Sequence, residues 1–145
     1  MRINSHDLKE LKILQYYRII RRSICAQFDI KQADLEILIY LDGLGHFDRQ
    51  TFIEGQYTYS WDQTRWDRLR TNGWVSEFRK RNKNQKYTIY QTSTKTRLMI
   101  MRMYRIMLGE EDIPQTIRSP FYKRESYSDK VNAKAIDLMN KDKER

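Results

Sequence analysis

Residues 58–92 constrain the fold of this chain more than any other stretch. Ser60 can begin a helix because its hydroxyl accepts a bond from one of the first backbone N–H groups, and Gly73 can end it in the left-handed conformation. From Trp74 onward the apolar spacing changes from helical to alternating, which is typical of a strand. The stretch therefore predicts a short helix over residues 60–72 that runs directly into a strand.

A basic hairpin is expected after this strand. Its loop, residues 79–86, has no acidic residue, and Asn82 and Asn84 are residue types that tolerate turn conformations. Residues 87–90 then return as a second strand. A flexible basic loop supplies charge with little geometric precision, so its cations are expected to contact phosphates or the minor groove. These cations are Arg79, Lys80, Arg81, Lys83 and Lys86.

The positive charge of the chain is concentrated in this region. The net charge is +9, and residues 65–105 hold 12 of the 28 Lys and Arg residues but only Asp67 and Glu77 as acids. The remainder of the chain is close to neutral. So local an excess indicates a surface that binds a polyanion, and the alternative is a solvated basic surface.

Two helices are expected before the 60–72 helix and one after the hairpin. Residues 31–41 are mostly apolar and predict a core helix, and residues 47–55 predict a short helix capped by Asp48. Residues 95–108 predict a helix that is apolar on nearly all sides. Two helices joined by a glycine-containing turn, the second followed by a hairpin, make a helix-turn-helix with a wing.

Both ends of the chain are expected to be helical. Residues 7–27 predict one long helix with apolar side chains on more than one face. Residues 110–127 contain both prolines and predict a connector, after which Ser128 or Asp129 caps a final helix. Helices with this much apolar surface need a partner, so we expect a homodimer through the terminal helices. The expected apolar stripe of the final helix is Val131, Ala135, Leu138 and Met139.

The residues favour neither catalysis nor metal binding. His6 and His46 are isolated, and no Cys or His pair has metal-ligand spacing, so we expect no enzyme activity, no metal and no cofactor. Cys25 is interpreted as packing, with a redox role left open. No apolar run is long enough to span a membrane, which predicts a soluble, cytoplasmic, DNA-associated protein. The tryptophans suit core packing better than stacking on single-stranded bases: Trp61, Trp66 and Trp74.

These features resemble the MarR-type family of winged helix-turn-helix transcription regulators. The resemblance covers about residues 27–104 and is carried by residues 64–75, with their helix and glycine stop, and by residues 89–95, where that family leaves the wing and enters its next helix. It implies a mainly α fold with a small β-hairpin and a single domain over the whole chain. The implied parts are a winged-helix core (28–92), dimerisation helices (7–27, 93–109 and 128–141) and a connector (110–127).

The resemblance also implies a function. A homodimer would place two 60–72 helices about one DNA turn, roughly 34 Å, apart in the major groove of double-stranded DNA, with the 79–86 wing beside the minor groove. Trp66 and Leu69 would point into the core. Fork-like side chains suit base reading, Gln63 for adenine and Arg65 and Arg68 for guanine, and contact with phosphates alone stays open. The residues expected to face DNA are Ser60, Gln63, Thr64, Arg65 and Arg68.

A second class of function stays open at this point. Winged helices also serve as docking modules, so the alternative is an adaptor or architectural subunit of a larger nucleoprotein or protein assembly. The sequence does not indicate a target site, a small-molecule effector, or whether the protein represses or activates.

Overall fold

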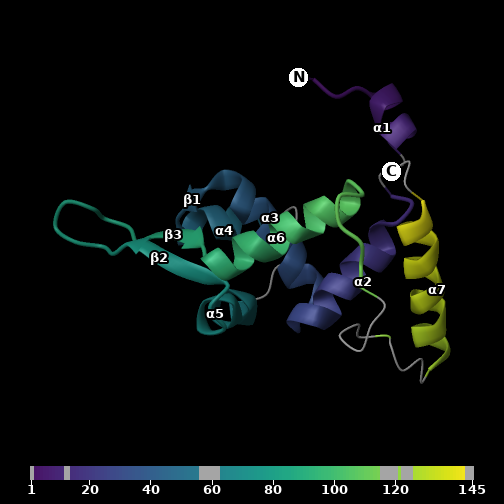
Figure 1. The fold of residues 1–145 in the computed structure, drawn as a ribbon. Helices are drawn as coiled ribbons and strands as arrows, with labels where there is room; N and C mark the ends of the chain where they lie inside the picture. Colours follow the sequence, from purple (N-terminus) through teal and green to yellow (C-terminus); the bar gives the residue numbers. More distant parts are fainter. Residues whose placement is uncertain (1, 12–13, 56–62, 115–120, 122–125, 143–145) are drawn as a thin grey trace. The chain divides into compact units, whose positions relative to one another are not determined.

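The computed structural model describes residues 2–11, 14–55, 63–114, 121 and 126–142 (Figure 1). Over these residues the fold is mainly helical, with seven helices and one small three-stranded antiparallel sheet. Among these helices, none combines the length and the apolarity needed to cross a membrane. The chain divides into two compact units: an inner unit, Ile30–Ile100, and a terminal unit, Met1–Asp29 with Met101–Arg145.

The inner unit contains the sheet and the helices around it. It confirms the expected core helix, the short helix after it, the hairpin and the start of the helix after the hairpin. The helix expected from Ser60 is described only from Gln63, so its predicted cap lies outside the described residues. In chain order the elements are α3 (Gln32–Leu44), β1 (His46–Phe47), α4 (Arg49–Gly55), α5 (Gln63–Thr71), β2 (Val75–Arg79), β3 (Ile89–Thr92) and the part of α6 (Thr94–Met107) up to Ile100.

Strand β1 is an addition to the expected hairpin. It pairs antiparallel with β3, His46 opposite Gln91 and Phe47 opposite Tyr90. Strand β2 pairs with the other edge of β3, which gives the order β1-β3-β2. Strand β1 has only two residues, too few to show an alternating pattern, so the sequence indicated the hairpin alone.

Trp66 is fully enclosed in the core of the inner unit. Its ring centroid lies 4.7 Å from that of Phe52 on α4 and 4.9 Å from that of Tyr90 on β3, which it meets edge-on. Trp66 and Leu69 are 2% and 0% exposed, which confirms that both point into the core. Burial of a large apolar side chain contributes about 1.5–3 kcal/mol. The buried apolar side chains of α3 are Leu35, Ile37, Leu38 and Leu41.

Gly73 ends α5 and turns the chain into β2, as predicted. Its φ is 78°, in the left-handed region. Its N–H donates to the Arg70 carbonyl at 3.2 Å, and the Trp74 N–H donates to the Leu69 carbonyl at 2.9 Å. These two bonds form a Schellman motif, in which the last carbonyls of a helix are satisfied by the residues that follow it.

The residue after this stop, Trp74, holds the first turn of α6. Its carbonyl accepts the Ser93 N–H at 3.1 Å and the hydroxyl of fully buried Thr96 at 2.6 Å. Lys95 covers the same corner, with its Nζ 3.9 Å from the Trp74 ring centroid and 2.7 Å from the Asn72 carbonyl, to which it donates. The end of α5, the start of β2 and the start of α6 are therefore joined directly.

The expected single helix over residues 7–27 is wrong. The terminal unit instead contains α1 (Ser5–Leu11) and α2 (Tyr17–Phe28), and Leu14–Tyr16 form a turn before α2. The Tyr16 side chain explains where α2 starts, because its hydroxyl donates to an Asp142 carboxylate oxygen at 2.8 Å. Such a tertiary contact overrides the helical preference of the local sequence.

Helix α7 (Tyr127–Lys141) packs against α2 in this unit. Arg18 donates to the buried Asn132 side chain at 3.2 Å. The helix begins earlier than predicted, because the Ser126 hydroxyl accepts the Asp129 N–H at 3.0 Å and is the cap.

The buried side of α7 also differs from the expected stripe. Only Met139 of that stripe is buried, whereas Val131 is 38% and Leu138 56% exposed and Ala135 is half-buried. Two asparagines shift the buried side, since each finds a partner: Asn132 bonds Arg18, and Asn140 pairs with the Ile113 backbone N–H and carbonyl at 3.3 and 2.9 Å. A polar side chain with bonded partners can replace an apolar one in a core. The buried residues of α7 are Asn132, Ala133, Ile136 and Met139.

Substitution of Gly73 tests the turn from α5 into β2. Gly73→Ala should lower the free energy of unfolding by about 1–2 kcal/mol, because a Cβ is disfavoured in the left-handed region. The cost is conformational, since the added Cβ would meet only Lys95 Nζ, at 3.8 Å. Gly43→Ala in α3 is the control, because nothing lies within 4 Å of its added Cβ. Gly43→Ala should raise the free energy of unfolding, measured in urea, by about 0.5 kcal/mol. Equal effects of the two substitutions would contradict the left-handed requirement at Gly73.

Candidate nucleic-acid interface

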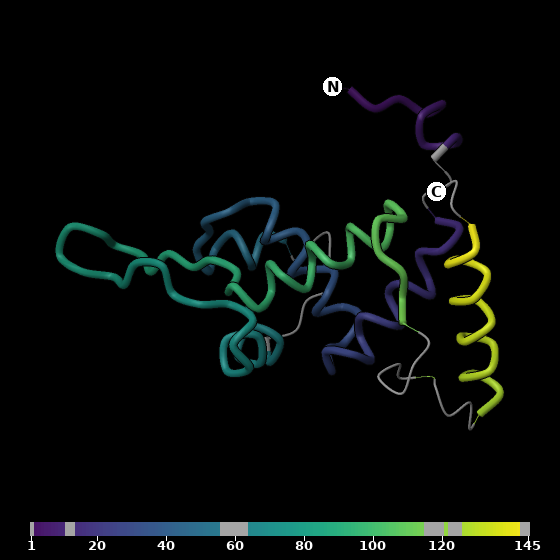
Figure 2. The backbone as a smooth tube through the Cα atoms, viewed as in Figure 1, coloured from purple at the N-terminus to yellow at the C-terminus, as the bar shows by residue number. Residues whose placement is uncertain are grey.

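Residues 79–88, which comprise the last residue of β2 and the connection to β3, are called the basic loop below. Figure 2 shows its backbone extending beyond the paired strands. Asn82 and Gln85 bond each other through both backbone groups, at 2.9 and 3.3 Å. The Asn82 side-chain oxygen accepts the N–H groups of Asn84 and Gln85 at 2.8 and 2.9 Å. The tip is therefore a hydrogen-bonded turn held by one asparagine side chain.

The turn expected at the asparagines is confirmed, and it depends on a side-chain bond and not on a left-handed backbone. Asp29 is the one non-glycine residue with positive φ among those described, so neither Asn82 nor Asn84 takes the left-handed conformation. Asn82 instead serves as an acceptor for the turn. A side chain that bonds its own backbone two residues on is the second reason why asparagine is common in turns.

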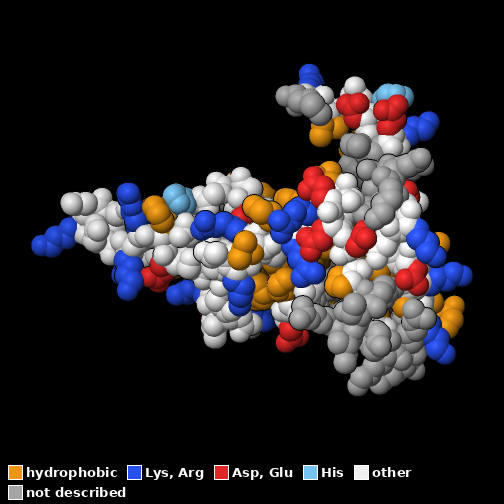
Figure 3. Space-filling view, viewed as in Figure 1, with side chains coloured by type: hydrophobic (Ala, Val, Ile, Leu, Met, Phe, Trp, Pro, Cys, Tyr) orange, Lys and Arg blue, Asp and Glu red, His pale blue; other side chains and the backbone are white. Residues whose placement is uncertain are grey.

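The five cations of the basic loop are exposed, as expected. Figure 3 shows Lys and Arg side chains along the projecting loop. Within the described part of the chain, no ion pair engages any of the five. The Arg79 guanidinium lies 5.3 Å from the ring centroid of Phe78, and Lys86 Nζ lies 5.4 Å from that of Tyr87. Their charges are therefore not neutralised by neighbouring acids.

Phe78 braces the base of this loop. The β2–β3 register shifts between Glu77 and Arg79, so Phe78 is an extra residue on β2. It is 41% exposed, and its ring stacks on His46 of β1 with centroids 3.9 Å apart. The alternating pattern predicted from Trp74 onward places Trp74 and Phe78 on one face of the strand, but Trp74 is 5% exposed and Phe78 41%, so the two do not share a buried face. A bulge of this kind redirects a side chain and increases local twist.

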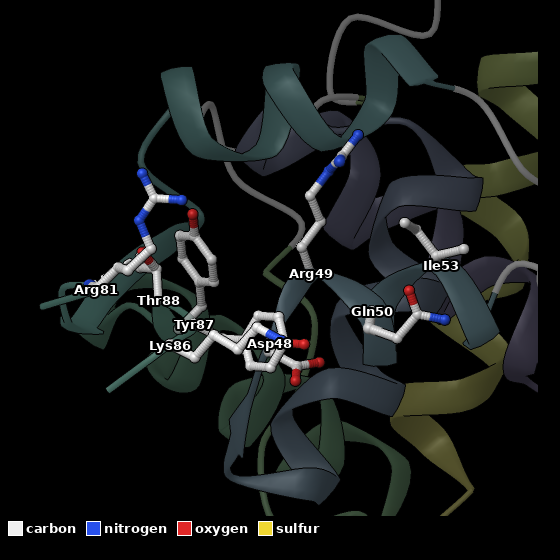
Figure 4. Close-up of a pocket in the computed structure, with 9 residues that line it drawn as sticks. Asp48, Arg49, Gln50, Ile53, Arg81, Lys86, Tyr87 and Thr88 are labelled. Atoms are coloured by element: carbon white, nitrogen blue, oxygen red, sulfur yellow. Dashed lines mark hydrogen bonds between the residues drawn. The ribbon is translucent and has the colours of Figure 1, made fainter. Parts of the chain in front are cut away.

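An open groove of about 460 Å³ separates the first turn of α4 from the basic loop (Figure 4). Figure 4 shows Arg81, Lys86 and Tyr87 coming from the loop and Arg49 coming from α4. Asp48, an acid in the lining, is occupied in capping α4, since it accepts the N–H and hydroxyl of Thr51 at 2.8 and 2.9 Å. The lining residues are Asp48, Arg49, Gln50, Ile53, Arg81, Lys86, Tyr87, Thr88 and Tyr90.

Arg49 was not among the predicted site residues. It is exposed and brings a third cation to the groove. The sequence showed that Arg49 directly follows the capping Asp48. It did not show that the pairing of β1 with β3 brings the start of α4 beside the basic loop. The confirmed cap at Asp48 is what fixes this first turn.

The expectation that Arg65 is exposed on α5 is wrong. Arg65 is 8% exposed, and its Nε donates to Asp34 Oδ1 at 2.9 Å. Arg68, with 26% of its side chain exposed, donates through Nε and Nη2 to the two oxygens of the same carboxylate, each at 2.8 Å. Asp34 lies in the first turn of α3 and is 3% exposed. A buried carboxylate needs such partners, and this requirement turns both arginines toward α3.

The exposed side of α5 carries other residues. Thr64, Asp67 and Thr71 are exposed and follow one another at helical spacing, opposite the buried Trp66 and Leu69. The predicted contact Thr64 is thus on this side. Ser60 and the Gln63 side chain lie outside what the structure describes, so their predicted contacts stay predictions.

The network of Asp34 with Arg65 and Arg68 can be tested by removing its carboxylate. Asp34→Ala should lower the free energy of unfolding by about 3–5 kcal/mol, because it leaves buried guanidinium charge without its acid. The triple variant Asp34→Leu with Arg65→Met and Arg68→Met should recover most of this loss in urea unfolding, since apolar groups of similar volume replace all three charges. If the single variant unfolds like the parent, the network does not hold α5.

The chain was compared with protein-family models, with curated proteins and with solved structures, and no match was found in any of the three. The resemblance to MarR-type regulators therefore stays a prediction.

Proposed function

We propose that this chain is a transcription regulator that binds double-stranded DNA as a homodimer through a winged helix-turn-helix. The element order of the inner unit supports the proposal: α3, β1, α4 and α5 precede a β2–β3 hairpin with a projecting loop. In this assignment α4 and α5 form the helix-turn-helix and the basic loop is the wing. Cofactors and catalysis have no part in it.

The basic loop carries the proposal. Five exposed cations on a hydrogen-bonded hairpin, without ion pairs in the described structure, are suited to phosphates spaced along a nucleic-acid backbone. Arg49 extends the same positive surface across the groove to α4. Trp66 and Trp74 are buried and so offer no surface on which the bases of a single strand could stack, whereas Phe78 at the base of the basic loop and Tyr87 within it are 41% and 57% exposed. Competition with a single strand therefore belongs to the test of this proposal.

Fewer side chains of α5 are proposed to contact DNA than the sequence indicated. The helix enters the major groove with the side that carries Thr64, and Ser60 and Gln63 stay further predicted contacts. Arg65 and Arg68 both belong to the packing against α3, with 10% and 26% of their side chains exposed. Phosphate contact therefore comes mainly from the loop and base reading from α5.

The experiment that tests this function is a competition assay. Labelled duplex selected from a random pool is competed with random duplex, single strand and heparin at fixed salt. A regulator should prefer its selected duplex by roughly a thousandfold over random duplex. An adaptor subunit with the same fold should show no such preference.

The contribution of the basic loop follows from its salt dependence. Lys80→Ala with Lys83→Ala should weaken binding to all duplexes alike and flatten the slope of log affinity against log salt by about 1.8, at about 0.9 per phosphate contact. The control, Lys130→Ala with Lys134→Ala, removes two exposed lysines from α7 and should leave the slope unchanged. Unchanged slopes in both variants would remove the loop from the interface.

The homodimer is proposed from exposed apolar side chains on α7. Tyr127, Val131 and Leu138 are 83%, 38% and 56% exposed and recur at helical spacing. Ile20 is 2% exposed in the terminal unit, so a charge there would damage the fold and not report on assembly.

Leu138→Asp should convert the dimer to monomers, because a charge in the interface would have no partner. Light scattering at micromolar concentration measures the mass. Leu44→Asp at the end of α3, where the side chain is 44% exposed, is the control and should stay dimeric. A parent mass near 17.8 kDa that does not change with dilution or added DNA contradicts the dimer.

A further inference from the structure

An acid stands in the middle of the exposed side of α5. Thr64, Asp67 and Thr71 occupy successive exposed positions, three and four residues apart, on the side opposite Trp66 and Leu69. No hydrogen bond or ion pair engages the Asp67 carboxylate within the described structure. The one residue of this row with a full charge is therefore negative, on a helix that is followed in the chain by the basic loop.

The arginines beside this row are occupied within the protein. Arg68 is held by Asp34 on one side. On the other side, the Arg70 guanidinium lies 5.8 Å from the ring centroid of Trp66 and 5.6 Å from that of Tyr90, and 4.0 Å from a Glu77 oxygen. The side chains that could neutralise Asp67 on its own helix are thus directed elsewhere.

We propose that Asp67 contacts base edges in the major groove and makes DNA binding selective for a cytosine. This inference rests on the proposed DNA-binding function. A carboxylate is repelled by phosphates, so a negative residue on a DNA-facing helix lowers affinity everywhere except where it meets a hydrogen-bond donor. In the major groove the donors are the amino groups of cytosine and adenine.

Cytosine is the better partner of the two. Adenine presents the acceptor N7 beside its amino group, which repels the second oxygen of a carboxylate, whereas the cytosine amino group has no such neighbour. Guanine offers two acceptors in this groove, and thymine an acceptor and a methyl group. The methyl and hydroxyl groups of Thr64 and Thr71 suit the flanking base pairs, so the acid supplies the main discrimination.

The test substitutes the acid by its neutral isostere. Asp67→Asn should exchange the cytosine at one position of the selected site for adenine, because an asparagine amide matches adenine N6 and N7. The ratio of affinities for the two bases at that position should change by roughly tenfold to a hundredfold. Binding to random duplex should strengthen severalfold, because one negative charge facing the phosphates is removed. Selection from a random duplex pool, followed by titration of matched duplexes at fixed salt, measures both effects.

Glu110→Gln is the matched control, since it neutralises an exposed carboxylate outside the inner unit and should change neither preference nor affinity. A variant that strengthens binding to every duplex equally, with the same preferred base, overturns the inference and makes Asp67 a neighbour of the backbone only. A variant identical to the parent also overturns it. Failure of the proposed function looks different, because then the parent itself would select no duplex.

Discussion

The buried carboxylate of Asp34 is the interaction on which the orientation of α5 depends. It accepts three bonds of 2.8–2.9 Å from Arg65 and Arg68, which stand three positions apart on the helix. Removal of such charges from water costs several kcal/mol per ion, so they are stable in the interior only together. Both guanidinium groups reach the Asp34 carboxylate when α5 has one particular orientation about its helix axis. The same orientation buries Trp66 and determines which side of the helix faces away from α3.

Because of this network, the number of Lys and Arg residues in a stretch of the sequence is not the positive charge that the stretch presents at the surface. Counted along the chain, residues 65–105 are strongly basic, but several of their cations are engaged inside the inner unit. Arg65 and Arg68 neutralise Asp34, and Lys95 donates to the Asn72 carbonyl just after α5. Arg97 donates twice to the Thr92 carbonyl, at 3.2 and 3.0 Å. The charge that is free of such partners in the described structure lies mainly in the basic loop. A local excess of Lys and Arg therefore overstates the surface that a polyanion meets.

The parts of the fold that the sequence predicted are those set by neighbouring residues. Gly73 ends a helix because of its own backbone freedom, and Asp48 begins one because it can accept the N–H of Thr51. The alternating apolar pattern after Gly73 and the cations of the basic loop can likewise be recognised from neighbouring residues alone. These signals were enough for the order of α3, α4, α5, β2 and β3, but not for β1 or for the division of the N-terminal helix into α1 and α2.

The errors concern residues whose partners are far away in the chain. No pattern around Arg65 reveals that a carboxylate 31 positions earlier holds it. The start of α2 depends on a bond between Tyr16 and Asp142, and the buried side of α7 depends on partners for Asn132 and Asn140. In each case one polar contact outweighs an apolar pattern, because an unsatisfied buried polar group costs about 1–3 kcal/mol.

Strand β2 connects the basic loop to α5, and it is held by bonds and contacts at both ends. The basic loop was expected to be flexible, yet its tip is closed by the Asn82 side chain and its base is braced by the stack of Phe78 on His46. At the other end of β2, the Trp74 carbonyl ties the strand to Ser93 and Thr96 directly after the stop of α5. The loop and the exposed side of α5 are therefore attached to one strand that is bonded at both ends. In the proposed function, cations presented in this way would lose less conformational freedom on binding, and they would contact phosphates at a defined distance from the helix proposed to read the bases.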